Sequence, residues 1–335
     1  MNEDSYLLAV LLGIVEGLTE FLPVSSTAHL RIFQAMVGLD LESAYWKMYT
    51  VVIQLGAILA VVLYFWKRLM KFMGTFPRGE AGDRTAFTHP LSLVMIAFVA
   101  TAVPAFLLTG LIKDNLESLY LMGGSLIVGG IIMWVVDVRY GRTSQVVAEP
   151  VGVAPGALTP SVAGYKDKPV PEQEVRQDGP VRTLGGGTAG STAVMEQMRP
   201  WQALWIGLVQ VLSAVFPGTS RSMSTIAAGQ LAGLSRPAAL EFSFFLSIPI
   251  MFAACSYDLL KTVTAEPGSA DALDAALRPE QWIQLAIGFV VSFFVAWGVI
   301  AWFMAWVRRR GFVPFAIYRL IVGVVVIVAA WAGWL

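Results

Sequence analysis

The chain has 335 residues, of which 56% are hydrophobic and only 14% are charged, and its mean hydropathy is +0.67. A soluble domain carries about a quarter charged residues, so this composition excludes an ordinary soluble protein. The net charge of zero gives no support to nucleic-acid binding, and the single cysteine, Cys255, excludes an intrachain disulfide and a thiolate metal cluster. Residues 1–4 lack the basic region of a signal peptide, so we expect them to be mature sequence.

The first apolar stretch, at about 5–36, is interrupted near its middle by Pro23 and a run of Ser and Thr. A proline inside a helix removes a backbone hydrogen bond. Non-helical backbone at membrane depth is tolerated only where protein or water surrounds it. We therefore expect this stretch to form a re-entrant helical hairpin, which enters the membrane and returns to the same side.

Further along the chain, apolar runs of about 20 residues are long enough to cross a bilayer as helices. Residues 143–199 are rich in Gly, Pro and Ala without periodicity, which predicts a flexible cytoplasmic linker. A second interrupted stretch, at 201–234 and broken at Pro217, predicts a second re-entrant hairpin. The six full crossings are expected at about 46–66, 89–111, 120–138, 238–258, 281–306 and 314–335.

The two halves of the chain resemble each other at a constant offset of 194 positions. This offset pairs Gly13 with Gly207, Glu16 with Gln210, Leu18 with Leu212, Thr19 with Ser213, Pro23 with Pro217, Ser25 with Thr219 and Ser26 with Ser220. The register indicates a duplication, with residues 1–142 as the first membrane repeat and residues 200–335 as the second. Broken helices in equivalent places of such repeats are where substrate sites form.

Lysine and arginine indicate the orientation, because cytoplasmic loops of membrane proteins carry an excess of them. Most of the 23 cationic residues lie on one side if both termini are outside and the linker is inside. The second repeat then begins inside, so the repeats have opposite topology and the hairpin tips meet near the midplane. The predicted fold is an all-α integral membrane protein with an inverted-topology repeat, six transmembrane helices and two re-entrant hairpins.

Glu16 and Glu20 are four residues apart, so they share one helix face about one turn apart. Two carboxylates at membrane depth repel each other unless a divalent cation or a shared proton neutralises them. The alternative is a solvated pair near the membrane surface. Ionisable residues inside a membrane usually have a function, which favours a neutralised site.

Ser25, Ser26, Thr27 and His29 follow Pro23 at the predicted tip of the first hairpin. Ser26 and His29 are close enough in sequence for a hydroxyl–imidazole pair, which can serve nucleophilic or acid–base chemistry. The alternative is that the Ser/Thr run only caps the next helix. The other histidine, His89, is expected to be incidental.

The second tip has the sequence Pro217-Gly-Thr-Ser-Arg-Ser, and Ser224 and Thr225 follow it. Gly218 permits a tight turn, and the hydroxyls and backbone N–H groups at the start of the next helix form an anion nest. Arg221 adds a cationic fork suited to phosphate. The alternative is a structural ion pair between Arg221 and a carboxylate such as Glu241.

Together, two carboxylates, a histidine, hydroxyls and an arginine inside a bilayer indicate a metal-assisted phosphate site. The nucleotide P-loop is absent, because no G-x-x-x-x-G-K-[ST] occurs in the chain. Lipid phosphatases of the vanadium-haloperoxidase type are also disfavoured. They have a histidine six residues after the arginine of their Ser-Arg pair, where this chain has Ala227.

Two motifs resemble the signatures of the bacterial undecaprenyl-diphosphatase family associated with bacitracin resistance: Glu16-Gly-Leu-Thr-Glu20-Phe-Leu-Pro-Val-Ser-Ser-Thr-Ala-His29 and Pro217-Gly-Thr-Ser-Arg-Ser222. The blocks Gln54-Leu-Gly-Ala-Ile-Leu-Ala and Phe312-Val-Pro-Phe-Ala-Ile-Tyr-Arg319 are also similar to family blocks. The resemblance covers both repeats. It departs at Met223 and Ser224, where the family commonly has Gly-Ala, and in the long linker.

The resemblance implies an inner-membrane enzyme that removes the terminal phosphate of undecaprenyl diphosphate, and so regenerates the carrier lipid for peptidoglycan synthesis. It implies a divalent cation, Mg²⁺ or Ca²⁺, and an active site that opens to the periplasm. The family's functional positions fall on Glu16, Glu20, Ser26, His29, Ser220, Arg221, Ser222 and Thr225.

From these residues we expect the following roles. The catalytic set is Ser26, His29, Glu20 and Arg221; the phosphate-binding set is Ser220, Arg221, Ser222, Thr225, Gly218, Ser25 and Thr27; and the metal ligands are Glu16 and Glu20. The attacking group stays open between Ser26, His29 and water. The alternative function is a polyprenyl-phosphate flippase or transporter that uses the same inverted-repeat site. The oligomeric state also stays open, a homodimer included.

Overall fold

The computed structural model describes residues 3–39, 43–79, 82–111, 118–141, 192, 194–265 and 277–334. These residues form helices and contain no strand beyond one isolated bridge between Thr192 and Leu234. Six helices are long and apolar enough to cross a membrane. They are α3 (Ala44–Tyr64), α5 (Pro90–Leu107), α7 (Leu119–Tyr140), α10 (Arg236–Thr264), α11 (Pro279–Val307) and α12 (Val313–Trp331). The predicted all-α membrane protein with six crossings is therefore confirmed.

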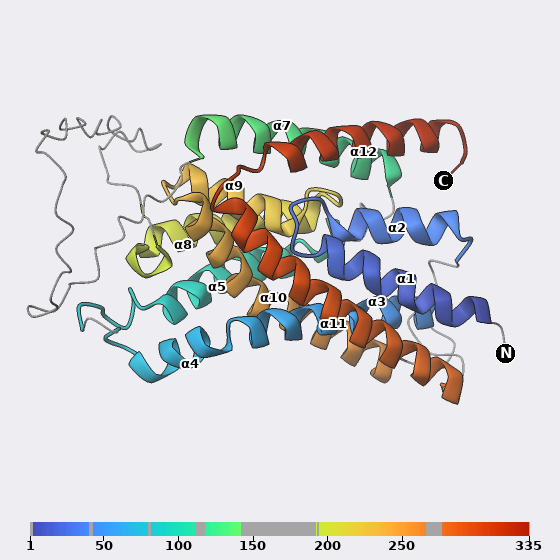
Figure 1. Cartoon of the computed structure of the whole chain (residues 1–335), viewed down its shortest axis with the longest axis horizontal. Coiled ribbons are helices and arrows are strands. Elements are labelled where there is room, and N and C mark those ends of the chain that lie inside the picture. The colour runs from blue at the N-terminus through green and yellow to red at the C-terminus, as the bar shows by residue number, and fades with distance from the viewer. Residues whose placement is uncertain are drawn as a thin grey trace, which may run out of the picture.

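The two interrupted stretches each form a pair of short helices. The first pair is α1 (Glu3–Thr19) and α2 (Ser26–Met36), and the second is α8 (Pro200–Val215) and α9 (Arg221–Leu231). In each pair the helices pack on each other, and the proline lies in the break between them. Each helix is shorter than the roughly 20 residues that a crossing needs. Figure 1 shows the two pairs extending to opposite ends of the molecule, with their breaks between those ends.

The two breaks have the same cap. Ser25 precedes α2 and Ser220 precedes α9, both with a positive φ, of 76° and 71°. Each serine Oγ accepts a hydrogen bond, at 3.4 Å, from the backbone N–H three residues later. Ser25 is therefore the equivalent of Ser220, and the predicted match of Ser26 with Ser220 is wrong by one residue. The second tip has one more residue between its proline and its cap, and Gly218, at φ 89°, makes that extra turn possible.

Each hairpin packs against a crossing helix of the other half. α1 packs mainly on α11, and α8 packs on α5. Gly13 of α1 lies against the carbonyl of Gly288, and its repeat partner Gly207 lies against the carbonyl of Ala97. Small residues at such positions let helix backbones approach closely in membranes. α7 pairs with α12 and α3 with α10, so the halves are interlocked (Figure 1). This reciprocal packing supports the opposite topology of the repeats, which stays a prediction.

Two structured segments were not predicted from the sequence. A short helix, α4 (Trp66–Thr75), continues from the end of α3. The final residues of the predicted linker, 194–199, are also packed: they include a 3₁₀ turn, η1 (Met195–Gln197), in which Met195 is fully buried. Glu196 pairs with Arg68 of α4 at 2.6 Å, which holds this segment against the bundle. The rest of the predicted linker lies outside the described residues.

Candidate active site

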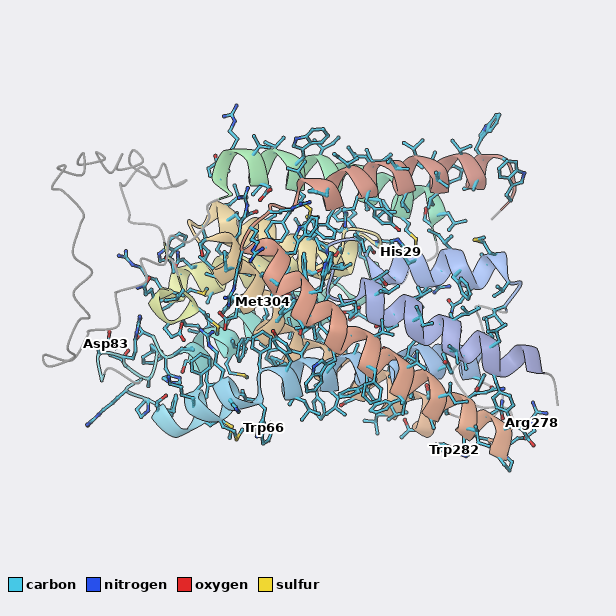
Figure 2. The ribbon with its side chains drawn as sticks, viewed as in Figure 1. His29, Trp66, Asp83, Arg278, Trp282 and Met304 are labelled. Atoms are coloured by element: carbon cyan, nitrogen blue, oxygen red, sulfur yellow. The ribbon has the colours of Figure 1, made fainter. Side chains whose placement is uncertain are left out.

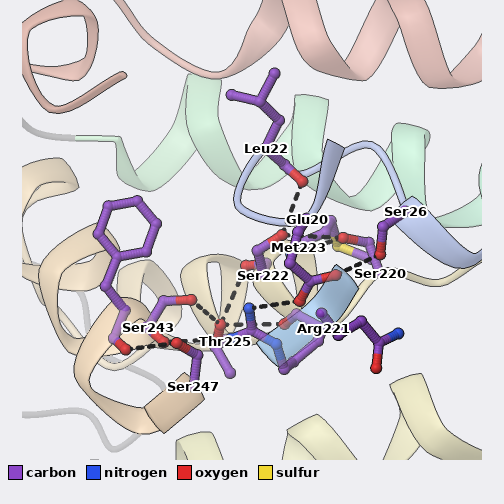
Figure 3. A network of polar contacts seen from close by, with 12 residues as sticks. Glu20, Leu22, Ser26, Ser220, Arg221, Ser222, Met223, Thr225, Ser243 and Ser247 are labelled. Atoms are coloured by element: carbon purple, nitrogen blue, oxygen red, sulfur yellow. Dashed lines mark hydrogen bonds and ion pairs between the residues drawn. The ribbon is translucent and has the colours of Figure 1, made fainter. Parts of the chain in front are cut away.

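Glu20 connects the two hairpin tips. This residue follows α1 directly, and its side chain is buried. Its Oε2 accepts a hydrogen bond of 2.5 Å from the Ser26 hydroxyl, and its Oε1 accepts one of 3.2 Å from Arg221 Nη2 (Figure 3). A hydroxyl of the first tip and a guanidinium of the second therefore share one carboxylate. The structure thus brings together three of the four predicted catalytic residues.

Glu16 lies one turn before Glu20 and is fully buried. Neither of its carboxylate oxygens has a hydrogen-bond donor from another part of the described chain, and the acidic group that interacts with it is Glu20. The alternative of a solvated surface pair is therefore wrong, because water does not reach Glu16. Two buried carboxylates side by side, with free oxygen lone pairs, fit a hard divalent cation that binds oxygen ligands.

The protein supplies only part of such a cation's coordination shell. Among the described residues, no group of three His, Cys, Asp or Glu side chains could hold a metal ion. Mg²⁺ commonly binds one or two carboxylates and completes its shell with substrate phosphate oxygens and water. The donor set of Glu16 and Glu20 fits that pattern better than a closed structural metal site.

The second tip is held by its own hydroxyls. Ser220 Oγ lies 3.1 Å from Ser222 Oγ, and Thr225 Oγ1 lies 2.6 Å from Ser243 Oγ on α10. Arg221 Nη1 also donates to the Ser243 carbonyl at 3.3 Å (Figure 3). Ser243 was missed by the sequence analysis, because nothing in an apolar helix marks one serine as a neighbour of this site.

One hydrogen-bond donor of Arg221 is unused. Its Nε is buried and has no hydrogen-bond partner, although both Nη groups are used. Arg221 does not pair with Glu241, which pairs with Arg68 instead, but it does form an ion pair with the carboxylate of Glu20. Gly218 is also placed as expected: a Cβ there would collide with the backbone carbonyl of Met122. The tip therefore approaches α7 more closely than any other residue type would allow.

His29 is placed beside the tip, but not as predicted. Its Nδ1 lies 2.7 Å from the Ser25 carbonyl oxygen and its Nε2 lies 2.7 Å from the Tyr318 hydroxyl. The expected pair of Ser26 with His29 is therefore not formed, since both ring nitrogens are used elsewhere and Ser26 donates to Glu20. His29 lies between the ends of the molecule marked by Asp83 and Arg278 (Figure 2). Thr27 is exposed at the same tip and lines a cavity of about 290 Å³.

Comparison with known proteins identifies the family. The family model described as bacitracin resistance protein BacA matches residues 9–325. The chain belongs to this family. A relative named undecaprenyl-diphosphatase from Koribacter versatilis (strain Ellin345) is 52% identical over 330 residues, which cover 98% of this chain and 99% of the relative. Relatives of the same name are 36% identical over 319 residues in Thermoanaerobacter sp. (strain X514), covering 95% and 94%, and 35% over 327 residues in Caldanaerobacter subterraneus, covering 98% and 97%.

In this BacA-family protein the cap of α9 involves Met223 and Ser224 of the second motif. The backbone N–H of Met223 donates to Ser220 Oγ, and the Ser224 hydroxyl donates to the Ser220 carbonyl at 3.0 Å. The Met223 side chain is buried, and its terminal methyl group lies beside Gly129 of α7. The Met223 side chain thus fills the space next to Gly129.

Proposed function

We propose that this protein hydrolyses undecaprenyl diphosphate to undecaprenyl phosphate and inorganic phosphate. The observation that carries this proposal is the bridge of Glu20 between Ser26 and Arg221, beside the unpartnered carboxylate of Glu16. A site that only carries a phosphate head group needs the arginine and the hydroxyls, but has less need of paired carboxylates. The names of the relatives also favour hydrolysis over the flippase alternative.

The terminal phosphate is expected to bind at the start of α9. Backbone N–H groups at a helix N-terminus favour an anion, and Arg221 adds a planar fork with its free Nε donor. In this proposal the hydroxyls of Ser220 and Thr27, one from each tip, contact phosphate oxygens, although Ser220 Oγ also accepts from the backbone N–H of Met223. Ser222 and Thr225 are engaged with protein partners, so we assign them mainly to holding the second tip.

Glu20 and Ser26 are expected to carry the chemical step. The short hydrogen bond from Ser26 Oγ to Glu20 makes the carboxylate the proton acceptor as Oγ attacks the terminal phosphorus. The bond between that phosphorus and the bridging oxygen breaks, and undecaprenyl phosphate leaves with the bond's electron pair. Water then hydrolyses the phosphoserine to release inorganic phosphate. Arg221 stabilises the charge that develops on the phosphoryl oxygens.

Glu16 and Glu20 would hold Mg²⁺ or Ca²⁺ next to the diphosphate. When bound, a divalent cation supplies positive charge that offsets the diphosphate and helps to orient it. No donor group of the described residues occupies the oxygens of Glu16, which leaves them free to bind a cation. In this scheme the leaving oxygen takes its proton from Nε2 of His29, whose ring Tyr318 holds in place.

The protein is proposed to lie in the bacterial inner membrane with its site open to the periplasm. Both chain termini lie at one end of the molecule (Figure 1), and that end is assigned to the periplasm. The cationic residues of α4, Lys67, Arg68 and Lys71, and the run of arginines at 308–310 would then be cytoplasmic, as membrane proteins prefer.

Phosphate release from undecaprenyl diphosphate in lipid nanodiscs tests the function. The wild-type chain should release phosphate, and the Arg221→Ala variant should not. The Glu280→Gln variant, which changes an exposed carboxylate in the first turn of α11, is the matched control and should retain full activity. Movement of the lipid across the bilayer without phosphate release would contradict the proposal and favour a transporter.

A further inference from the structure

Arg319 of α12 is the largest fully buried side chain of the described residues. Its guanidinium forms no ion pair among these residues and instead donates to three backbone carbonyls. Nη1 donates to Pro23 at 3.2 Å, and Nη2 donates to Gly218 at 3.0 Å and to Ser125 at 3.2 Å. An arginine in the interior of a membrane protein is costly to place and usually has a function.

Two of these carbonyls lie in the helix breaks of the two hairpins. No helix supplies donors to a carbonyl at a break, and no lipid can do so at membrane depth. The two carbonyls are also equivalent, because Pro23 and Gly218 each lie two residues before a capping serine. One guanidinium therefore bonds matched points of both tips, one with each terminal nitrogen.

The matched points stand directly before the reacting groups. Ser26 follows Pro23 by three residues, and Arg221 follows Gly218 by three residues. The tips also contact each other through the Glu20–Arg221 ion pair and the bond from Ser222 to Leu22, and both involve residues of the candidate site. The Arg319 bonds involve backbone carbonyls that take no part in catalysis, so they can persist while substrate is bound.

We propose that Arg319 is a positioning residue, which sets the separation of the two hairpin tips and so aligns Ser26 and Glu20 with Arg221. The inference rests on the proposed phosphatase function. The planar fork of arginine reaches two separate carbonyls at once, whereas the ammonium of lysine presents its donors from a single point. Arginine is therefore required, and a positive charge alone is not enough.

Gly129 of α7 provides the space that the guanidinium of Arg319 occupies. A Cβ at Gly129 of α7 would collide with Nη2 of Arg319, so only glycine leaves room for the guanidinium. A Cβ at Gly124 on the same helix would meet nothing within 4 Å. The Gly129→Ala variant thus crowds the Arg319 fork, together with the terminal methyl group of Met223, without removing either, and Gly124→Ala is its matched control.

The test measures tip separation and catalysis in the same full-length protein. Spin labels are attached at Leu18→Cys and Leu212→Cys, exposed positions in the last turns of α1 and α8, after Cys255→Ser. In nanodiscs, Arg319→Lys and Gly129→Ala should each broaden or shift the distance distribution. Their kcat should fall on the order of a hundredfold, with KM within about threefold, as expected when reacting groups are misaligned. Gly124→Ala and Arg309→Lys, at an exposed arginine, should match the parent.

An unchanged distance distribution with unchanged kcat in both variants would overturn the proposal. So would a lower melting temperature with normal kcat per folded molecule, because it would make Arg319 a contributor to stability only. The distance measurement needs no turnover. If the parent chain releases no phosphate, the proposed function fails, while the distances still decide whether Arg319 sets the separation of the tips.

Discussion

Ser222 of the second tip donates its hydroxyl to the backbone carbonyl of Leu22 in the first tip, at 2.9 Å, although 200 positions separate them (Figure 3). The hydroxyl was expected to bind phosphate, but in this structure it joins the tips. We therefore expect different roles for these two residues. Ser222 stabilises the contact between the tips, and Arg221 binds the substrate phosphate.

Ser222→Ala removes one hydrogen bond between the tips, so it should lower stability by about 1 kcal/mol and kcat by roughly tenfold. Arg221→Lys keeps the positive charge but loses the bidentate fork, so kcat/KM should fall by roughly a hundredfold or more. Thermal unfolding and phosphate release measure the two effects. Near wild-type kcat/KM in Arg221→Lys would contradict the role given to the fork.

Glu20→Gln should cost several orders of magnitude in rate, because the amide is a poor proton acceptor and weakens the pair with Arg221. Glu16→Gln should instead raise the concentration of Mg²⁺ or Ca²⁺ needed for half-maximal activity, since it removes one charged ligand. Titration of the cation into chelator-treated enzyme separates the two variants. Full activity in excess chelator would exclude the metal role of both residues.

Ser26→Ala tests the attacking group. If Ser26 attacks, turnover should be almost abolished, and rapid quenching of the wild-type reaction should trap phosphoserine at position 26. Residual activity above about a hundredth of the wild-type rate, which is roughly 2.7 kcal/mol of transition-state stabilisation, would favour water as the attacking group. Ser26 would then serve to position that water through Glu20.

Tyr318→Phe removes the hydroxyl that lies 2.7 Å from His29 Nε2 and keeps the stacked ring at a centroid distance of 5.6 Å. The imidazole should lose its fixed orientation, and kcat should fall by roughly tenfold. His29→Gln in the same background gives the comparison. If Tyr318 works only by orienting His29, Tyr318→Phe should add nothing to the loss caused by His29→Gln alone.

The orientation can be tested with single cysteines in a chain that carries Cys255→Ser. Arg278→Cys lies before α11 at the end assigned to the periplasm, and Arg309→Cys lies after α11 at the opposite end. An impermeant thiol reagent added to intact cells should label only the first. Labelling of position 309 alone would reverse the proposed orientation.

Much of the fold could be predicted because apolar runs and prolines act locally. The six crossings follow from run length, and the two helix breaks follow from Pro23 and Pro217. The equivalence of Ser25 with Ser220 could not be predicted. The second tip contains one additional turn residue, Gly218, but the sequence around the tips still matches at the constant offset of 194. α4 was missed because its 10 residues carry three cationic side chains and fall short of a membrane crossing.

The sequence predicted most of the residues of the candidate site, but not the hydrogen bonds between them. Spacing in the chain suggested that Ser26 and His29 would bond each other, since they lie three residues apart. In the structure His29 Nε2 bonds the hydroxyl of Tyr318, 289 positions away, and Ser26 donates its hydroxyl to Glu20. Arg319 could be noticed as a charge in an apolar helix, but its bonds to both tips depend on how distant helices pack.

The packing of each hairpin against the opposite half has a consequence for biosynthesis. When α8 leaves the ribosome, its partner α5 is already in the membrane. α1 is made first, yet it packs mainly on α11. This packing can form only after residues 279–307 have been translated. Throughout that interval Glu16 lacks its final surroundings. We expect the first hairpin to settle last, and a nascent chain that stalls before α11 cannot assemble the site, although it already contains both carboxylates and Arg221.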